Sequence, residues 1–147
     1  MENKYDENGL LQLRNAIILQ AVADYETAIA VLSTEYNPQD LEQELTIELK
    51  KCSARKTKAE CEGFFKSKLY GMMTKIDGDA IKSMIINGIN NAGKLVYNID
   101  KGYYTCECGN RLAVNTLRLK RQQGSPMIKC NECKRYYRGF GKPIKVE

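Results

Sequence analysis

The chain contains no histidine among its 147 residues. Without an imidazole there is no Ser-His or Cys-His nucleophile pair, no histidine general base and no histidine metal ligand. Any metal site must therefore use thiolates or carboxylates. The sequence also lacks a phosphate loop, a dinucleotide fingerprint and a paired-carboxylate motif. We therefore predict that the protein is not an enzyme and acts by binding.

Long apolar runs are scarce as well. The best segment, residues 16–22, is interrupted by Gln20 and is well short of the roughly 18 residues that a membrane helix needs. The first seven residues are acidic and polar, unlike a secretory signal. We expect the protein in a reducing cytoplasm. In that reducing compartment six cysteines indicate metal binding or free thiols rather than disulfides.

Composition is that of a folded protein, with 43% hydrophobic and 28% charged residues. The net charge of +5 is distributed unevenly. Residues 1–50 carry three basic and ten acidic side chains, a net charge of −7. Residues 101–147 carry eleven basic and three acidic side chains, a net charge of +8. An acidic front and a basic back suggest two modules with different partners.

One long helix is predicted over residues 9 to about 35. Its apolar seam has the alternating three- and four-residue spacing of a heptad, and consists of Leu11, Arg14, Ile18, Ala21, Tyr25, Ala28 and Leu32. Two interpretations of this seam stay open. The helix belongs to an intramolecular bundle of four helices, or it forms a homo-oligomer by pairing with another copy.

Three further helices are predicted after it. Asn37 and Pro38 suit the cap and first turn of a second helix, which should end near residue 54. A short turn is expected at residues 53–58, followed by a third helix to about residue 76. Asp77 is the expected cap of a fourth. Together these helices form a bundle or hairpin module over residues 1–90.

Beyond Gly93 the pattern changes to short segments rich in strand-forming residues. Strands are predicted at residues 95–97, 103–105 and 127–129, and a further strand-like segment covers residues 136–140. The predicted fold class is therefore α+β, with the helical module followed by a small antiparallel β module over residues 94–147.

Four cysteines fall in two close pairs within this β module. Cys106 and Cys108 are separated by one residue, Cys130 and Cys133 by two, and 21 residues lie between the pairs. This pattern is similar to that of a zinc ribbon, in which two tight turns supply four thiolates to a tetrahedral structural zinc ion. Gly109 suits the turn after the first pair. Ribbons usually have two residues within each pair, so the first pair departs from the pattern.

The competing interpretation of these cysteines is four unrelated buried side chains, which leaves their pairing in a small basic segment unexplained. A segment of this size builds a poor core on its own, so a metal ion has a stabilising role to fill. Cys52 and Cys61, on predicted helices, are interpreted as packing residues rather than ligands.

Basic and aromatic side chains alternate through the same module. Cations gain affinity for phosphates through counterion release, and flat rings stack on exposed bases. We therefore predict contact with nucleic acid or another partner through Arg111, Arg118, Lys120, Arg121, Lys134, Arg135, Tyr136, Tyr137 and Arg138. Two alternatives remain: a solvated basic face whose rings pack on the ribbon core, and a protein-binding surface.

Two runs in the helical module carry a resemblance. They are RNAIILQAVADY at residues 14–25 and ECEGFFKSKLYGMMTKIDGD at residues 60–79, about a quarter of the chain. Both resemble small phage and prophage accessory proteins of Gram-positive bacteria, a group with no assigned activity. The resemblance implies a phage-encoded accessory protein in a bacterial cytoplasm and carries no functional residue over to this chain.

Two functions fit these observations. The first is a non-enzymatic phage-type accessory protein whose zinc ribbon binds nucleic acid or a nucleoprotein complex. The alternative is an anti-CRISPR-like inhibitor that binds a host defence nuclease directly, with a CRISPR effector as partner. No membrane partner is expected for either.

Overall fold

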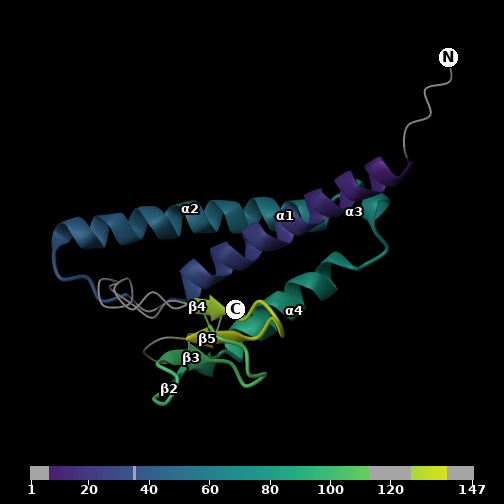
Figure 1. Cartoon of the computed structure of the whole chain (residues 1–147). Helices are drawn as coiled ribbons and strands as arrows, with labels where there is room; N and C mark the ends of the chain where they lie inside the picture. Colours follow the sequence, from purple (N-terminus) through teal and green to yellow (C-terminus); the bar gives the residue numbers. More distant parts are fainter. Residues whose placement is uncertain (1–6, 35, 113–126, 139–147) are drawn as a thin grey trace.

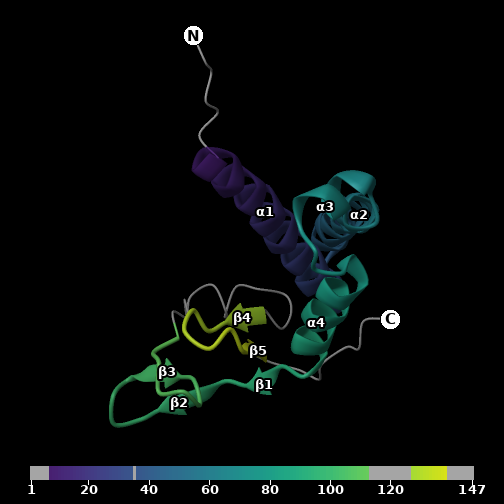
Figure 2. The same cartoon turned by 90° about the vertical axis from the view of Figure 1, so that its right-hand side faces the viewer.

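The structure is a computed structural model, and it describes residues 7–34, 36–112 and 127–138. Within these ranges four helices precede five short strands: α1 (Glu7–Ser33), α2 (Leu41–Phe65), α3 (Lys68–Met73) and α4 (Gly78–Asn90) come first along the chain. Helices α1 and α2 run in opposite directions, and the strands gather beside α4 (Figures 1 and 2). The predicted α+β class, with helices ahead of a small β module, is confirmed.

Helix α2 begins and ends later than predicted. Its N-cap is Asp40 rather than Asn37, because the Asp40 carboxylate accepts a hydrogen bond from the Gln43 amide at 2.8 Å. The Gln43 side chain in turn accepts one from the Gln39 amide at 2.7 Å. The helix then continues through residues 53–58, where a turn was predicted. Alanine, arginine and lysine in this segment favour a helix, and Ala54 is buried.

The predicted third helix, from after residue 58 to about residue 76, is not continuous. Its first part belongs to α2, and its second part is α3, which ends at residue 73. Helix α2 ends at Phe65 with Lys66 as its C-cap. Ser67 then caps α3, since its hydroxyl accepts a hydrogen bond from the Tyr70 amide at 3.2 Å. Asp77 caps α4 as predicted, accepting from the Ala80 amide at 3.3 Å. Gly78 follows because any Cβ there would collide with the carbonyl oxygen of Phe65.

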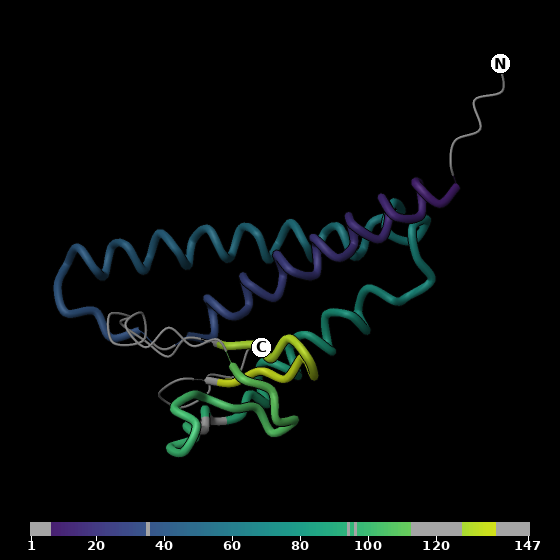
Figure 3. The backbone as a smooth tube through the Cα atoms, viewed as in Figure 1, coloured from purple at the N-terminus to yellow at the C-terminus, as the bar shows by residue number. Residues whose placement is uncertain are grey.

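The strands form two small sheets, and Figure 3 traces the path between them. Strands β2 (Val96–Asn98) and β3 (Tyr103–Thr105) are antiparallel, as are β4 (Met127–Lys129) and β5 (Tyr136–Arg138). A further strand, β1 (Gly93–Lys94), pairs in parallel with β5. The sequence did not predict this pairing. Gly93 permits it, because a Cβ there would lie 3.2 Å from the ring of Tyr137.

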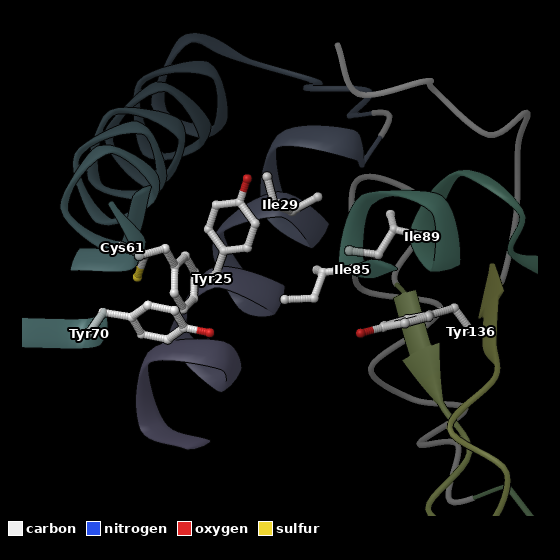
Figure 4. Close-up of a cluster of buried hydrophobic side chains, with 8 residues drawn as sticks. Tyr25, Ile29, Cys61, Tyr70, Ile85, Ile89 and Tyr136 are labelled. Carbon is white, nitrogen blue, oxygen red and sulfur yellow. The ribbon is translucent and has the colours of Figure 1, made fainter. Parts of the chain in front are cut away.

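The main hydrophobic core lies between the helices and includes one residue of the β module (Figure 4). Tyr25 and Ile29 of α1 are completely buried, as is Ile89 of α4. Tyr136 of β5 packs into the same cluster beside Ile85 and is 8% exposed. Residues on both sides of the predicted boundary near residue 90 therefore share one core.

Helix α1 is long and apolar enough to cross a membrane, judged by length and composition, and it is the one such helix in the described part of the chain. Of its most apolar 18-residue window, 22% is buried. Counting uninterrupted apolar residues missed this segment because Gln20 divides it. Buried helices of soluble proteins and N-terminal signal sequences have the same composition.

Candidate metal centre

Two similar turns hold the four cysteines of the β module. Cys106 directly follows β3, and Cys130 directly follows β4. In the first turn the Gly109 amide donates to the Cys106 carbonyl at 2.9 Å, and in the second the Lys134 amide donates to the Cys130 carbonyl at 3.0 Å. Both donors adopt positive φ, 89° at Gly109 and 62° at Lys134. The expected positive φ at Gly109 is confirmed, and the second turn, which is one residue longer, has a positive φ at Lys134 without glycine.

The turns bring the four thiols together. All four Sγ atoms lie within 4.8 Å of one another, with 3.3 Å between Cys106 and Cys133 and 3.7 Å between Cys108 and Cys130. Four sulfurs about 2.3 Å from a tetrahedral zinc ion are about 3.8 Å apart. All six cysteines of the chain are free thiols. The donor set and its spacing therefore fit one metal ion held by four thiolates.

Ionisation is divided unequally among the thiols. The backbone amide of Cys133 and the Asn110 side chain, working against burial, lower the pKa of Cys130 to about 6. Burial opposes ionisation of Cys106, yet hydrogen bonds led by Tyr137 lower its pKa overall.

The other two thiols ionise with more difficulty. The Arg135 amide favours the Cys133 thiolate, but hydrogen bonds to the neighbouring sulfurs and burial outweigh it and raise the pKa of Cys133 to about 12. At Cys108 the Asn110 amide is likewise outweighed, and the pKa is raised. The cluster thus gathers more thiols than it can ionise together without a cation, which is the environment that a metal ion relieves.

The Tyr137 hydroxyl contacts the turn that holds the first cysteine pair. Its hydroxyl lies 3.0 Å from Cys106 Sγ and accepts a hydrogen bond from the Glu107 amide at 3.1 Å. Because that amide is a donor, the hydroxyl proton remains free to point at the sulfur. Tyr137 is 2% exposed and packs with Leu112 in a small second core around the cysteines. Cys106 and Cys130 are buried in it, whereas Cys108 and Cys133 face solvent.

The residues predicted to contact nucleic acid are placed in different environments. Arg111 and Lys134 are exposed. Arg135 is exposed and forms an ion pair with Glu107. Tyr136 and Tyr137 are buried, so neither ring offers a free face for stacking, and we do not retain them in a contact surface. Arg138 lies in β5, and Arg118, Lys120 and Arg121 lie outside the described residues.

Aromatic rings that are not among the predicted contact residues lie on the β2–β3 hairpin. Tyr97 is 50% exposed and packs edge-on against Tyr104, with ring centroids 5.1 Å apart. The ring of Tyr103 lies 5.0 Å from the Arg111 guanidinium and 5.9 Å from Lys101 Nζ. The predicted strand at residues 103–105 could have pointed to these rings. Side chains alternate along a strand, so Tyr103 and Tyr104 lie on opposite faces of it.

The remaining two cysteines lie apart from this cluster. Cys61 is buried in the core of the helices, where burial and then the nearby carboxylates of Asp24, Glu60 and Glu62 raise the pKa of its thiol. Cys52 is exposed on α2. Neither joins the four-thiol group.

Comparison of the chain with protein-family models, with curated proteins and with solved structures found no match. What the molecule shows is therefore an α+β chain with a cysteine cluster, similar to that of a zinc ribbon, that could hold a metal ion.

Proposed function

We propose that this protein is a non-enzymatic nucleic-acid-binding protein whose ribbon is stabilised by a structural zinc ion. The observation that carries the metal assignment is the convergence of four thiols within 4.8 Å. Four thiolates fill the coordination sphere of zinc, whereas catalytic zinc sites keep one position open for water or substrate. The ion would therefore fasten the two turns to each other rather than perform chemistry.

Elemental analysis tests the metal. Protein purified without added metal should contain about one zinc per chain, and a content below about 0.2 with folding retained would contradict the proposal. Cys130→Ser should abolish zinc binding, because it removes the buried thiol at the start of the second turn. Cys52→Ser, an exposed cysteine outside the cluster, is the matched control and should leave the zinc content unchanged.

The contact with nucleic acid is supported by charge and by exposed rings. Residues 101–147 carry a net charge of +8. Arg111 and Lys101 flank the ring of Tyr103, and the half-exposed ring of Tyr97 is on the same hairpin. Cations that bind phosphates beside rings that stack on bases are the combination used for single strands. We therefore place the contact surface on the β2–β3 hairpin and the neighbouring exposed cations.

Salt dependence of binding to a single-stranded oligonucleotide tests this surface. If about four or five cations engage phosphates, affinity should fall by about two orders of magnitude between about 50 and about 200 mM salt. Arg111→Ala should weaken binding and flatten the salt dependence, whereas Lys56→Ala, an exposed cation on α2, should change neither. Tyr97→Ala should weaken binding while Tyr97→Phe, which keeps the ring, should not. Absence of binding at the lower salt concentration would refute direct contact.

Inhibition of a host defence nuclease, as by an anti-CRISPR protein, is the second candidate. Leu41, Leu45 and Leu49 are exposed along α2, with Glu44 and Glu48 exposed on the same helix. A mixed apolar and acidic surface suits a basic protein channel. The resemblance of the helical runs to phage accessory proteins agrees with either candidate. Affinity purification from a bacterial host separates them: one large nuclease as partner favours inhibition, and bulk nucleic acid favours the first proposal.

A further inference from the structure

The first half of α1 is an apolar helix that the rest of the described chain leaves uncovered. Leu10, Leu13 and Ile17 are 42%, 57% and 39% exposed, and Leu19 is 67% exposed. Between Asn8 and Ala23, Arg14 is the single charged residue. A helix that is apolar on most sides is normally buried. This part of α1 therefore needs a partner that covers its apolar side chains, which we call the occupant of this surface.

A groove between α1 and α2 runs alongside this surface. It consists of two adjoining hollows of about 460 and about 340 Å³ that share Asp24 and Thr57. Every lining residue comes from α1 or α2. Small side chains such as Ala16, Ala21 and Ala28 form much of the α1 wall, which lets a second helix approach closely.

One stripe of α1 along this groove is self-complementary. Its residues alternate in spacing between four and three, and they are Leu10, Arg14, Ile17, Ala21, Asp24 and Ala28. In an antiparallel pair of α1 helices centred midway between Ile17 and Ala21, each large apolar residue meets a small one. Ile17 lies opposite Ala21, and Leu10 lies opposite Ala28, which is 3% exposed and lines the groove. The single cation then lies opposite an anion, Arg14 against Asp24.

We propose that the occupant is a second copy of this chain, with the two α1 helices antiparallel about a two-fold axis that crosses the stripe midway between Ile17 and Ala21. Each contact then occurs twice. Arg14 and Asp24 are both exposed, and within the described residues the Arg14 side chain has no ion-pair or hydrogen-bond partner. Asp24 accepts one hydrogen bond, from the neighbouring Gln20 side chain at 2.8 Å. Dimerisation supplies the cation that this carboxylate lacks.

The size of the surface suits a stable dimer. Helices α1 and α2 have 27 and 25 residues, so each is about 40 Å long and about 10 Å wide. One face of the hairpin is then about 800 Å², which matches the area that each partner buries in a standard interface. The lining residues exclude α3, α4 and the strands, so the metal cluster stays accessible in the dimer.

A lipid bilayer is a poorer occupant of the same surface. The C-terminal part of α1 is held in the core through Tyr25 and Ile29. Ile18, Ala21 and Val22 also pack against this core, so the free part is residues 7–17. It is about 16 Å long, much shorter than the bilayer interior of about 30 Å. Arg14 would lie in its middle, where a charged side chain is strongly disfavoured.

Charge exchange tests the arrangement. Light scattering of the wild-type protein at micromolar concentration should give twice the 16.7 kDa chain mass. Arg14→Glu sets two carboxylates against each other across the interface, and Asp24→Arg sets two guanidinium groups against each other. Each variant alone should therefore raise the dimer dissociation constant by about tenfold or more. An equimolar mixture of the two variants should form a heterodimer, in which one of the two contacts joins the introduced carboxylate to the introduced guanidinium group. The double variant should regain the homodimer, because both of its contacts are then complementary.

Gln12→Glu, an exposed change on the opposite side of α1, is the matched control and should stay dimeric. Circular dichroism and zinc content of every variant should equal those of the wild type, which separates dissociation from unfolding. A wild-type mass of 16.7 kDa would overturn the proposal. A dimer that persists in both single variants would overturn it too, as would single variants that dissociate without recovery in the double variant. Lipid vesicles that capture the wild type as a monomer would assign the surface to membranes instead.

Discussion

Nζ of Lys129 lies 2.8 Å from both carboxylate oxygens of Glu26, a residue 103 positions earlier in the chain. The same ammonium group lies 5.4 Å from the ring centroid of Tyr136. Lys129 ends β4 and immediately precedes Cys130, while Glu26 belongs to α1. The hairpin that carries the second cysteine pair is therefore fastened to the helices by an ion pair as well as by the buried Tyr136.

A double-mutant cycle should measure this fastening. Lys129→Met and Glu26→Gln should show a coupling of about 1 kcal/mol in the free energy of unfolding, because both side chains are partly buried and in direct contact. Chemical denaturation followed by circular dichroism gives the values. The Arg55–Glu48 pair, 3.9 Å apart with both side chains more than half exposed, is the control and should couple by less than about 0.5 kcal/mol. Equal coupling in both pairs would contradict a special role for Lys129.

Tyr137→Phe should lower the affinity for the metal ion while leaving the four thiols in place. The variant removes the hydroxyl 3.0 Å from Cys106 Sγ and leaves the ring in its core. Loss of an outer-shell partner of this kind lowers metal affinity by about 10- to 100-fold. Competition with a chromogenic chelator measures the change. Tyr97→Phe removes a hydroxyl from an exposed ring on the neighbouring hairpin and should leave metal affinity unaltered.

Metal binding should release fewer than four protons per ion near neutral pH. The pKa of Cys130 is lowered to about 6, so this thiol is already largely ionised at pH 7, whereas the pKa of Cys133 is raised to about 12 and its proton must leave. Apparent affinity should therefore fall as pH decreases, and the fall should steepen below about pH 6, where Cys130 also carries a proton. Calorimetric titration in buffers of different ionisation enthalpy counts the protons. Release of four at pH 7 would show that Cys130 is not preionised.

Gly78→Ala should destabilise the helices by about 2 kcal/mol or more, since the new Cβ would collide with the Phe65 carbonyl at the start of α4. Gly63 offers a matched comparison within α2, because a Cβ there has no neighbour within 4 Å. Gly63→Ala should stabilise the protein by about 0.5–1 kcal/mol, the usual gain of alanine over glycine in a helix. Thermal melts of the two variants should therefore shift in opposite directions.

Much of this architecture was predictable from local chemistry. Asp77 as a cap and the strands around residues 103–105 and 127–129 follow from short-range preferences that the structure preserves. The cysteine cluster was equally predictable, because the close spacing within each cysteine pair indicated that the four thiols come together. Local preference failed where a nearby alternative was better: Asp40 replaced Asn37 because Gln43 and Gln39 complete its cap.

The partners of β5 could not be predicted in the same way. Tyr136 and Tyr137 are adjacent, so in a strand they point in opposite directions, one to the helices and one to Cys106. From the sequence alone, tyrosines interleaved with cations resemble a surface for stacking on bases, because the sequence does not show what each face of the strand packs against. The parallel pairing of Gly93 with Tyr137 could not be predicted from the residues around either position, because it depends on the fold that brings the two segments together.

That pairing also fixes an order of events during synthesis. β5 is the common neighbour of β1 and β4, yet it leaves the ribosome after both of them. The helices and β1 are translated before Tyr136, which packs in the helical core, and before the β5 residues that pair with β1. Closure of the sheet, completion of the helical core and binding of the proposed metal ion therefore all require the segment from Cys130 to Tyr137, the last of these parts to be translated.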